Sequence, residues 1–96
     1  MKLKNIEKYE GIYNISNTGI VGSIKRLRAL KFDNSSGYSR VILQKNKTKE
    51  RFLVHRLVAL HFVDGYFNGA IVNHIDGNKL NNHYSNLEWC NQSHNK

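Results

Sequence analysis

The first half of the chain consists of short runs in which apolar and polar residues alternate, separated by turn-forming residues. Residues 12–15 and 20–24 have this β-prone pattern, and the segment Ser-Asn-Thr-Gly between them predicts a hairpin turn. Residues 38–44 and 51–54 repeat the pattern around a lysine-rich tip. An antiparallel sheet with one apolar face and one basic face is therefore expected.

A helical pattern follows at residues 55–63. Its apolar face combines His55, Val58, Ala59 and Phe62, widened by Leu57 and Leu60. This spacing matches one side of a helix with 3.6 residues per turn and predicts a buried helix. His55 and His61 point to different sides of such a helix, so a structural role is expected for both rather than a shared metal.

The last quarter of the chain predicts a strand, a loop, a second strand and a helix. The apolar run 70–72 brings Asn73 and His74 to the end of a strand, where an Asp-Gly pair turns the chain. A polar loop leads to a second apolar run at 87–90, and Asn91 then offers an N-cap for a helix over the last residues.

Charge divides the chain into a basic part and a nearly neutral part. The 96 residues carry a formal net charge of +8, and 13 of the 15 Lys and Arg lie between residues 2 and 56. A basic lobe beside a polar lobe is typical of a protein that binds a polyanion and acts on it. The predicted DNA-binding residues are Lys25, Arg26, Arg28, Lys31, Arg40, Lys45, Lys47, Lys49, Arg51 and Arg56.

Several classes of protein are excluded by composition. The chain has one cysteine, which excludes a disulfide framework and a Cys-x-x-Cys zinc site and fits the cytoplasm. Its start lacks the apolar core of a signal peptide, and no apolar run is long enough to cross a membrane. At this length one domain with a modest core is expected.

Four segments resemble one family of nucleases. The segments Asn-His-Ile-Asp-Gly-Asn-Lys at 73–79 and Asn-Leu-Glu-Trp at 86–89 resemble the HNH nucleases, and they occur as a pair at this spacing in homing endonucleases of phages and group I introns. Residues 9–19 resemble the N-terminal module that accompanies these nucleases, and residues 54–59 (Val-His-Arg-Leu-Val-Ala) resemble the segment ahead of their motif.

The resemblance implies an α+β fold with two lobes. Residues 1–53 are expected to form a small basic antiparallel-sheet lobe that binds DNA. One buried helix follows, and residues 54–96 form an HNH lobe with the ββα-metal (His-Me finger) arrangement. Homing relatives continue into further helices and a sequence-reading domain, so this chain is expected to be a minimal or C-terminally truncated nuclease.

The resemblance also assigns roles to residues. His74 is the general base, Asn86 holds the imidazole of His74, and Asn73 with Asn95 binds a single divalent cation. His94 lies next to Asn95, and counting along the motif from Asn86 favours Asn95. In some intron-encoded relatives the residue before the histidine is Asp, so the neutral Asn73 should hold a cation less tightly.

These residue types suit phosphodiester hydrolysis. The reaction needs a deprotonated water in line with the leaving oxygen and a cation to neutralise charge on the phosphate. A histidine with an ordinary pKa of about 6.5 is largely neutral at pH 7 and can take that proton, which contributes typically ~10²–10⁴ in rate. Amide oxygens are hard ligands, so Mg²⁺ or Mn²⁺ fits better than Zn²⁺.

The sequence thus predicts a metal-dependent endonuclease that nicks double-stranded DNA. It is expected to act as a monomer, without a small-molecule cofactor, in a bacterial host cell where a phage or mobile element encodes it. The alternative is a catalytically silent DNA-binding remnant of an HNH homing endonuclease, in which Asn73 and a short last helix fail to hold metal. A third option is an RNA-binding protein.

Overall fold

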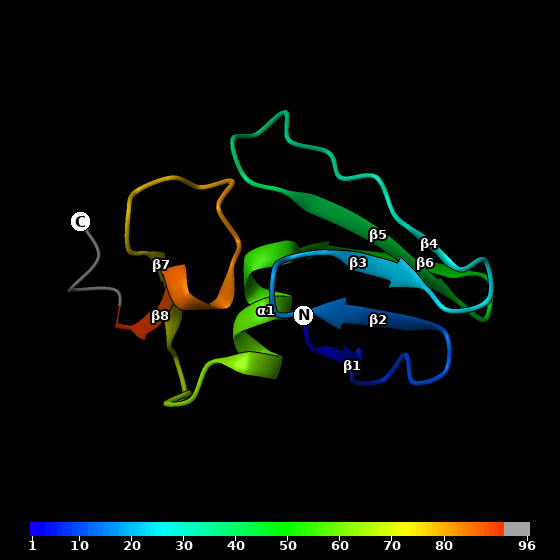
Figure 1. Cartoon of the computed structure of the whole chain (residues 1–96), viewed down its shortest axis with the longest axis horizontal. Coiled ribbons are helices and arrows are strands. Elements are labelled where there is room, and N and C mark those ends of the chain that lie inside the picture. The colour runs from blue at the N-terminus through cyan, green and yellow to red at the C-terminus, as the bar shows by residue number, and fades with distance from the viewer. Residues whose placement is uncertain (92–96) are drawn as a thin grey trace.

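The basic lobe begins with a four-stranded antiparallel sheet. In this computed structural model, which describes residues 1–91, the strands lie side by side in chain order (Figure 1). They are β1 (Leu3–Asn5), β2 (Tyr13–Ser16), β3 (Val21–Ser23) and β4 (Arg28–Ala29). The predicted hairpin is present as β2 and β3, whereas the sequence does not predict β1 and β4, because their residues are all exposed and show no apolar alternation.

Ser16 stabilises the turn between β2 and β3. Its hydroxyl oxygen accepts hydrogen bonds from the backbone N–H groups of Thr18 (3.3 Å) and Ile20 (2.9 Å). Gly22, a glycine within a predicted strand, marks a close approach of two strands. The Asn14 side-chain oxygen lies 2.5 Å from the position that a Cβ at Gly22 would occupy, so a larger residue there would require the Asn14 side chain to move.

A separate two-stranded hairpin completes this lobe. It consists of β5 (Arg40–Lys45) and β6 (Thr48–Leu53). Asn46 and Lys47 at its tip have φ angles of 52° and 65°, as a two-residue type I′ turn requires. The single sheet predicted from the sequence is therefore wrong in one respect, because residues 30–39 form an irregular connection and the strands divide into two sheets.

The alternation predicted for β5 is confirmed. Val41 and Leu43 face the core and are 3% and 0% exposed, while Ile42 between them is 55% exposed. On the outer face Ile42 is paired with Arg51, and Lys49 is paired with Gln44. The hairpin thus has an apolar face toward the core and an outer face that carries cationic side chains.

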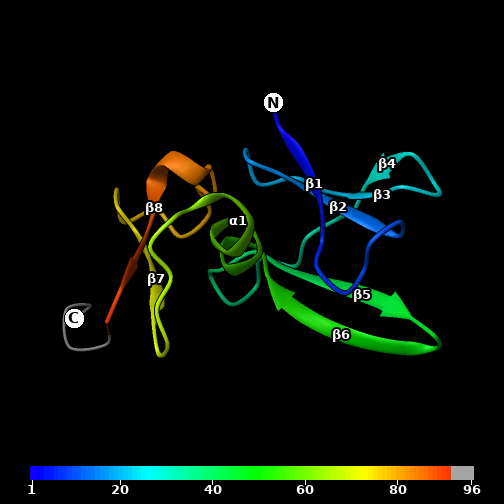
Figure 2. The same cartoon turned by 90° about the horizontal axis from the view of Figure 1, so that it is seen from below.

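Helix α1 (Val54–Phe62) lies at the centre of the molecule, between the sheets of the basic lobe and the C-terminal hairpin (Figures 1 and 2). Its first residue is held by a hydrogen bond from the Val54 N–H to the Ser39 carbonyl oxygen (2.9 Å). The predicted buried helix is confirmed except that Leu60 is half exposed. Across residues 1–91, no helix has the length and apolar character needed to span a membrane.

One apolar core joins the two parts of the chain. Ile15 and Leu43 from the basic lobe, Val58 from α1 and Leu87 from the last strand belong to the same cluster of buried side chains. Trp89 packs against this cluster, and its indole N–H donates to the Val63 carbonyl oxygen (3.0 Å). The C-terminal hairpin is therefore fastened to the helix and to the residue that follows it, and the division at residue 53 stays a prediction.

Candidate active site

A two-stranded hairpin presents the predicted base. It consists of β7 (Ile71–His74) and β8 (Leu87–Cys90), joined by a loop that ends in a short 3₁₀ helix, η1 (Tyr84–Asn86). His74 is the last residue of β7, where its carbonyl oxygen accepts from the Gly77 N–H (2.9 Å) to close the predicted turn. Because side chains alternate along a strand, Asn73 and His74 point to opposite faces of this hairpin.

The imidazole of His74 is buried and oriented by Asn82. His74 is 7% exposed, and its Nε2 lies 3.0 Å from the side-chain oxygen of Asn82. An amide oxygen only accepts hydrogen bonds, so Nε2 must donate its proton. The neutral ring then carries its lone pair on Nδ1, which is the form that a general base needs.

Asn86 does not make the hydrogen bond to His74 that the sequence motif suggests. In the structure the hydrogen bond expected from Asn86 to His74 is made by Asn82. The Asn86 side chain, 9% exposed, instead accepts from the Asp76 N–H (3.0 Å) and donates to the Asp76 carboxylate (2.9 Å) and the Asn81 carbonyl oxygen (3.0 Å). Asn86 is the last residue of the loop, and its side chain is directed toward Asp76 and Asn81.

Asp76 is the second centre of this loop. Its carboxylate accepts from the Asn81 side chain (3.0 Å) and the Asn78 N–H (2.7 Å), in addition to the bond from Asn86. These hydrogen bonds, that from Asn81 foremost, hold the pKa of Asp76 below its ordinary value. Because these hydrogen bonds favour the ionised carboxylate, Asp76 stabilises the folded loop at pH values above its pKa in the unfolded chain. This stabilisation is lost as the pH falls through the lower pKa of the folded state.

Two aromatic rings pack against His74. The His55 ring from α1 meets it edge-on at 4.9 Å between centroids, and the Tyr38 ring lies 6.1 Å away. Lys79 from the loop places its ammonium 4.9 Å from the centre of the Tyr38 ring. Burial lowers the pKa of His55 to about 4, with smaller contributions from His74 and Arg56. His55 is therefore a neutral packing partner at physiological pH.

Stability should fall in acid through His55. The ring takes up a proton near pH 6.5 when exposed but only near pH 4 in the fold, so the unfolded chain binds more protons between these values. The contribution of His55 to the free energy of unfolding is complete above pH 6.5 and is lost progressively as the pH falls toward about 4. Urea denaturation across this range should show a steeper loss for the wild type than for His55→Leu. If stability falls with pH equally in the wild type and in His55→Leu, His55 is not the cause of the loss.

The predicted metal ligand Asn73 is paired across the hairpin with Glu88. The two residues lie directly opposite each other, and the Asn73 amide nitrogen donates to the Glu88 carboxylate at 2.9 Å. The second predicted ligand, Asn95, and its neighbour His94 lie outside the described residues. Within residues 1–91, no group of three or more His, Cys, Asp or Glu side chains is arranged to hold a metal ion.

The predicted DNA-binding residues are exposed except for Arg40 and Arg56, which are partly buried. The exposed ones lie on the segment 25–31 around β4 and on the β5–β6 hairpin. Arg40 differs, because it donates to Asp33 at 2.9 Å and its charge is locally neutralised. Arg56 also differs, since its guanidinium packs 5.9 Å above the Trp89 ring.

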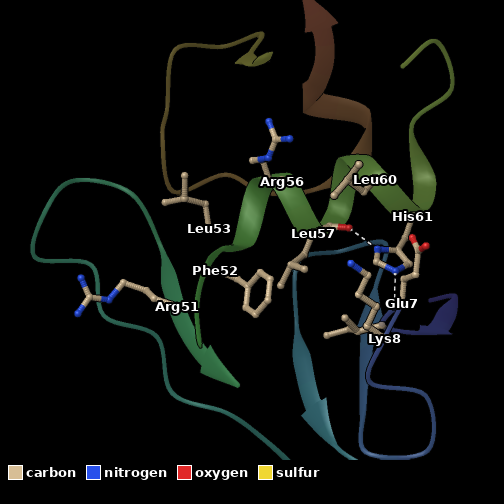
Figure 3. A pocket seen from close by; sticks show the side chains of 10 residues that line it. Glu7, Lys8, Arg51, Phe52, Leu53, Arg56, Leu57, Leu60 and His61 are labelled. Carbon is tan, nitrogen blue, oxygen red and sulfur yellow. Dashed lines mark hydrogen bonds between the residues drawn. The ribbon is translucent and has the colours of Figure 1, made fainter. Parts of the chain in front are cut away.

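A hollow of about 480 Å³ opens on another side of the molecule, between the N-terminal segment, β6 and α1 (Figure 3). His61 at its edge donates from Nδ1 to the Leu57 carbonyl oxygen (2.7 Å) and accepts at Nε2 from the Glu7 N–H (3.1 Å). Both ring nitrogens are thus used to fasten the N-terminal segment to the helix. These bonds agree with the structural role expected for His61.

Sequence reasoning missed four side chains around the two faces of the hairpin: Tyr38, Lys79, Asn82 and Glu88. Asn82 lies within an asparagine-rich loop, where only its spacing of eight residues from His74 distinguishes it. Glu88 had a detectable signal, because it lies in the Asn-Leu-Glu-Trp segment on a predicted strand, opposite Asn73 if the two strands pair. Tyr38 is remote in sequence and could not be placed without the fold.

Comparison with known proteins identifies relatives. Residues 52–96 match the family model described as HNH endonuclease. The chain is 50% identical over 93 residues to the DNA endonuclease I-HmuI of Bacillus phage SP01, covering 96% of this chain and 53% of that protein. It is 52% identical over 83 residues to an uncharacterized HNH endonuclease of Acanthamoeba polyphaga mimivirus, covering 86% of this chain and 25% of that protein.

A solved structure shows the same fold. The structure of the HNH homing endonuclease I-HmuI, described for its DNA binding and cleavage, superimposes with a TM-score of 0.96 at 49% sequence identity. The match covers 99% of this chain and 55% of that chain. This chain therefore spans about half the length of I-HmuI.

Proposed function

Because this chain carries an HNH endonuclease domain over residues 52–96 and is homologous to the phage homing endonuclease I-HmuI, we propose that it is a divalent-metal-dependent endonuclease that nicks double-stranded DNA. The observation that carries this proposal is the orientation of His74, whose Nε2 faces the Asn82 oxygen while Nδ1 is left as the proton acceptor. I-HmuI is described as binding and cleaving DNA, and that activity supports the same substrate here.

In this proposal the protein supplies the proton acceptor and its placement. His74 takes a proton from a water molecule at Nδ1, and the resulting hydroxide forms a bond to phosphorus while the P–O bond to the in-line leaving oxygen breaks. The leaving oxygen then takes a proton from solvent. Asn82 holds the neutral ring in the tautomer with the proton on Nε2 before this transfer and keeps its hydrogen bond to Nε2 afterwards. His55, which stays neutral beside it, adds no competing positive charge at pH 7. Asn86 and Asp76 maintain the loop that follows the base.

A divalent cation is expected at Asn73, because HNH nucleases generally use one. The residues fit a hard cation: the Asn73 amide donates through nitrogen to Glu88, so its oxygen remains unused by that bond and is available as a ligand. When bound, the cation would neutralise charge that develops on the phosphate. Mg²⁺ or Mn²⁺ is the proposed ion, and Asn95 the second protein ligand.

The basic lobe is proposed to hold the DNA. Exposed cations on the β4 segment and on the outer face of β5–β6 would contact phosphates, which position the duplex without reading its sequence. We further propose that the chain acts as a monomer, on DNA within the cell that hosts its coding element.

Conversion of supercoiled plasmid to the nicked form with Mg²⁺ or Mn²⁺ tests the proposed function. Nicking that stops when EDTA is added would support it. DNA binding without cleavage in any divalent metal would instead favour the silent DNA-binding remnant, and preferential binding of RNA would favour the third option. A linear product at early times would replace nicking by double-strand cleavage.

Removal of positive charge from the β4 segment should weaken DNA binding. Lys25, Arg26 and Arg28 are exposed there, and their joint replacement by glutamine removes up to three cations that can bind phosphates. The slope of log affinity against log salt should then become shallower by ~0.9 for each phosphate that is no longer neutralised. Fluorescence anisotropy of a labelled duplex at several salt concentrations measures this slope. Lys2→Gln, at an exposed lysine outside the predicted set, is the control, and equal slopes would remove the β4 segment from the DNA surface.

A further inference from the structure

We infer that Glu88 is part of the divalent-cation site at Asn73, where it orients the Asn73 amide and supplies the negative charge that amide ligands lack. This inference rests on the proposed function. It concerns a side chain on β8 to which the sequence motif assigned no role, and it follows from one cross-strand contact and from the charges around it.

The contact determines which end of the Asn73 amide faces a cation. A carboxylate accepts hydrogen bonds and cannot donate them, so the Asn73 atom 2.9 Å from the Glu88 oxygen must be the nitrogen. The amide oxygen of Asn73 is then directed away from that bond. Without Glu88 the amide could rotate and present its N–H groups, which repel a cation.

The carboxylate of Glu88 also has charge to contribute. Within the described residues 1–91, the only ion pair joins Arg40 to Asp33, so Glu88 has no basic partner there. Its side chain is exposed at the surface of β8, beside Asn73. Hard divalent cations bind most strongly where carboxylates accompany neutral oxygens. An exposed, unneutralised carboxylate beside a neutral amide provides that combination.

Asp76 is nearby in sequence but is a poorer candidate for this role. Its carboxylate already accepts hydrogen bonds from Asn78, Asn81 and Asn86, which maintain the loop. A cation there would compete with all three donors. The Glu88 carboxylate, by contrast, accepts one hydrogen bond from residues 1–91, and its donor is the proposed ligand Asn73 itself.

Mn²⁺ titration of the ¹⁵N-labelled full chain, followed by NMR, tests the inference without DNA. Paramagnetic Mn²⁺ should broaden the side-chain amide signal of Asn73 and the backbone signals of β7 and β8. Glu88→Gln keeps the size of the side chain but removes its charge and allows the Asn73 amide to rotate. Half-broadening should then require ~10–100-fold more Mn²⁺, the loss typical when an outer partner of a metal ligand is removed.

Two further variants separate charge at this site from charge in general. Glu50→Gln removes an exposed carboxylate on β6 and should leave the titration unchanged. The double variant Asn73→Asp, Glu88→Gln moves the carboxylate from β8 to the facing position on β7 and should restore most of the Mn²⁺ affinity. Failure of this rescue would show that Glu88 does not act through the site at Asn73.

The outcomes distinguish this inference from the proposed function. Equal Mn²⁺ requirements for the wild type and Glu88→Gln, or broadening away from the hairpin, would overturn the role of Glu88 while plasmid nicking by the wild type could still stand. Conversely, if the wild type never nicks plasmid but shows Glu88-dependent broadening at Asn73, the cation site would be supported and the proposed nuclease activity would be refuted.

Discussion

Replacing His74 by alanine should abolish plasmid nicking and leave DNA affinity nearly unchanged. General base catalysis typically contributes ~10²–10⁴ in rate, and His74 is the proposed proton acceptor. The side chain is buried against His55 and Asn82 and is not one of the exposed Lys and Arg residues proposed to contact phosphates, so the variant keeps all of those cations. Gel-based nicking rates and anisotropy with the same duplex measure the two quantities.

A second histidine provides the matched control. His83 lies in the same loop, but its Nδ1 accepts from the Ser85 N–H and caps the 3₁₀ helix η1. His83→Ala should therefore retain nicking. Equal loss of cleavage in both variants, or loss of DNA binding and of folded structure in His74→Ala, would mean that His74 has a structural role.

Replacing Asn86 should cost both stability and cleavage. Asn86→Ala removes three hydrogen bonds and leaves the Asn81 carbonyl and the Asp76 N–H without this partner. Loss of a buried amide of this kind is expected to lower the free energy of unfolding by about 2 kcal/mol. The loop begins directly after His74, and a shift of about 1 Å in a reacting group can cost ~10²-fold in rate.

Asn86→Asp sharpens this prediction. It keeps the shape and the acceptor for the Asp76 N–H but sets a second carboxylate oxygen against the Asp76 carboxylate, where a donor lies at 2.9 Å in the wild type. Urea denaturation at neutral pH should show at least as great a loss as the alanine variant. Asn78→Ala, which removes one hydrogen bond to the Leu80 N–H from an exposed side chain of the same loop, should have a small effect. Similar midpoints for all variants would refute the role of Asn86.

Local patterns in the sequence were sufficient for the elements and for the position of His74. The β2–β3 and β5–β6 hairpins, the helix α1 and the end of β7 all follow from alternation, turn residues and helical spacing, which act over a few residues. The α+β class and the relationship to HNH endonucleases are confirmed by the solved structure and the family match. The separation of β4 from β5 was not foreseen, since it depends on the path of an irregular segment.

The partners of individual side chains could not be predicted in the same way. The motif pointed to Asn86 as the holder of the imidazole, yet several asparagines follow His74 within one loop and have identical chemistry. Which of them reaches the ring depends on how the loop closes, and this is decided by the contacts of Asp76 with Asn81 and Asn86. The roles of Asn73, Asn82 and His74 in catalysis stay predictions.

The central position of α1 has a consequence for how such proteins can recombine. Residues on both sides of the boundary at residue 53 contribute to one apolar cluster, and the Glu7 N–H bonds to His61 near the end of the helix. A gene exchange that joined a foreign N-terminal segment at this predicted boundary would leave α1 facing side chains that had not evolved with it. Inheritance of residues 1–53 together with α1 is therefore the physically favoured course.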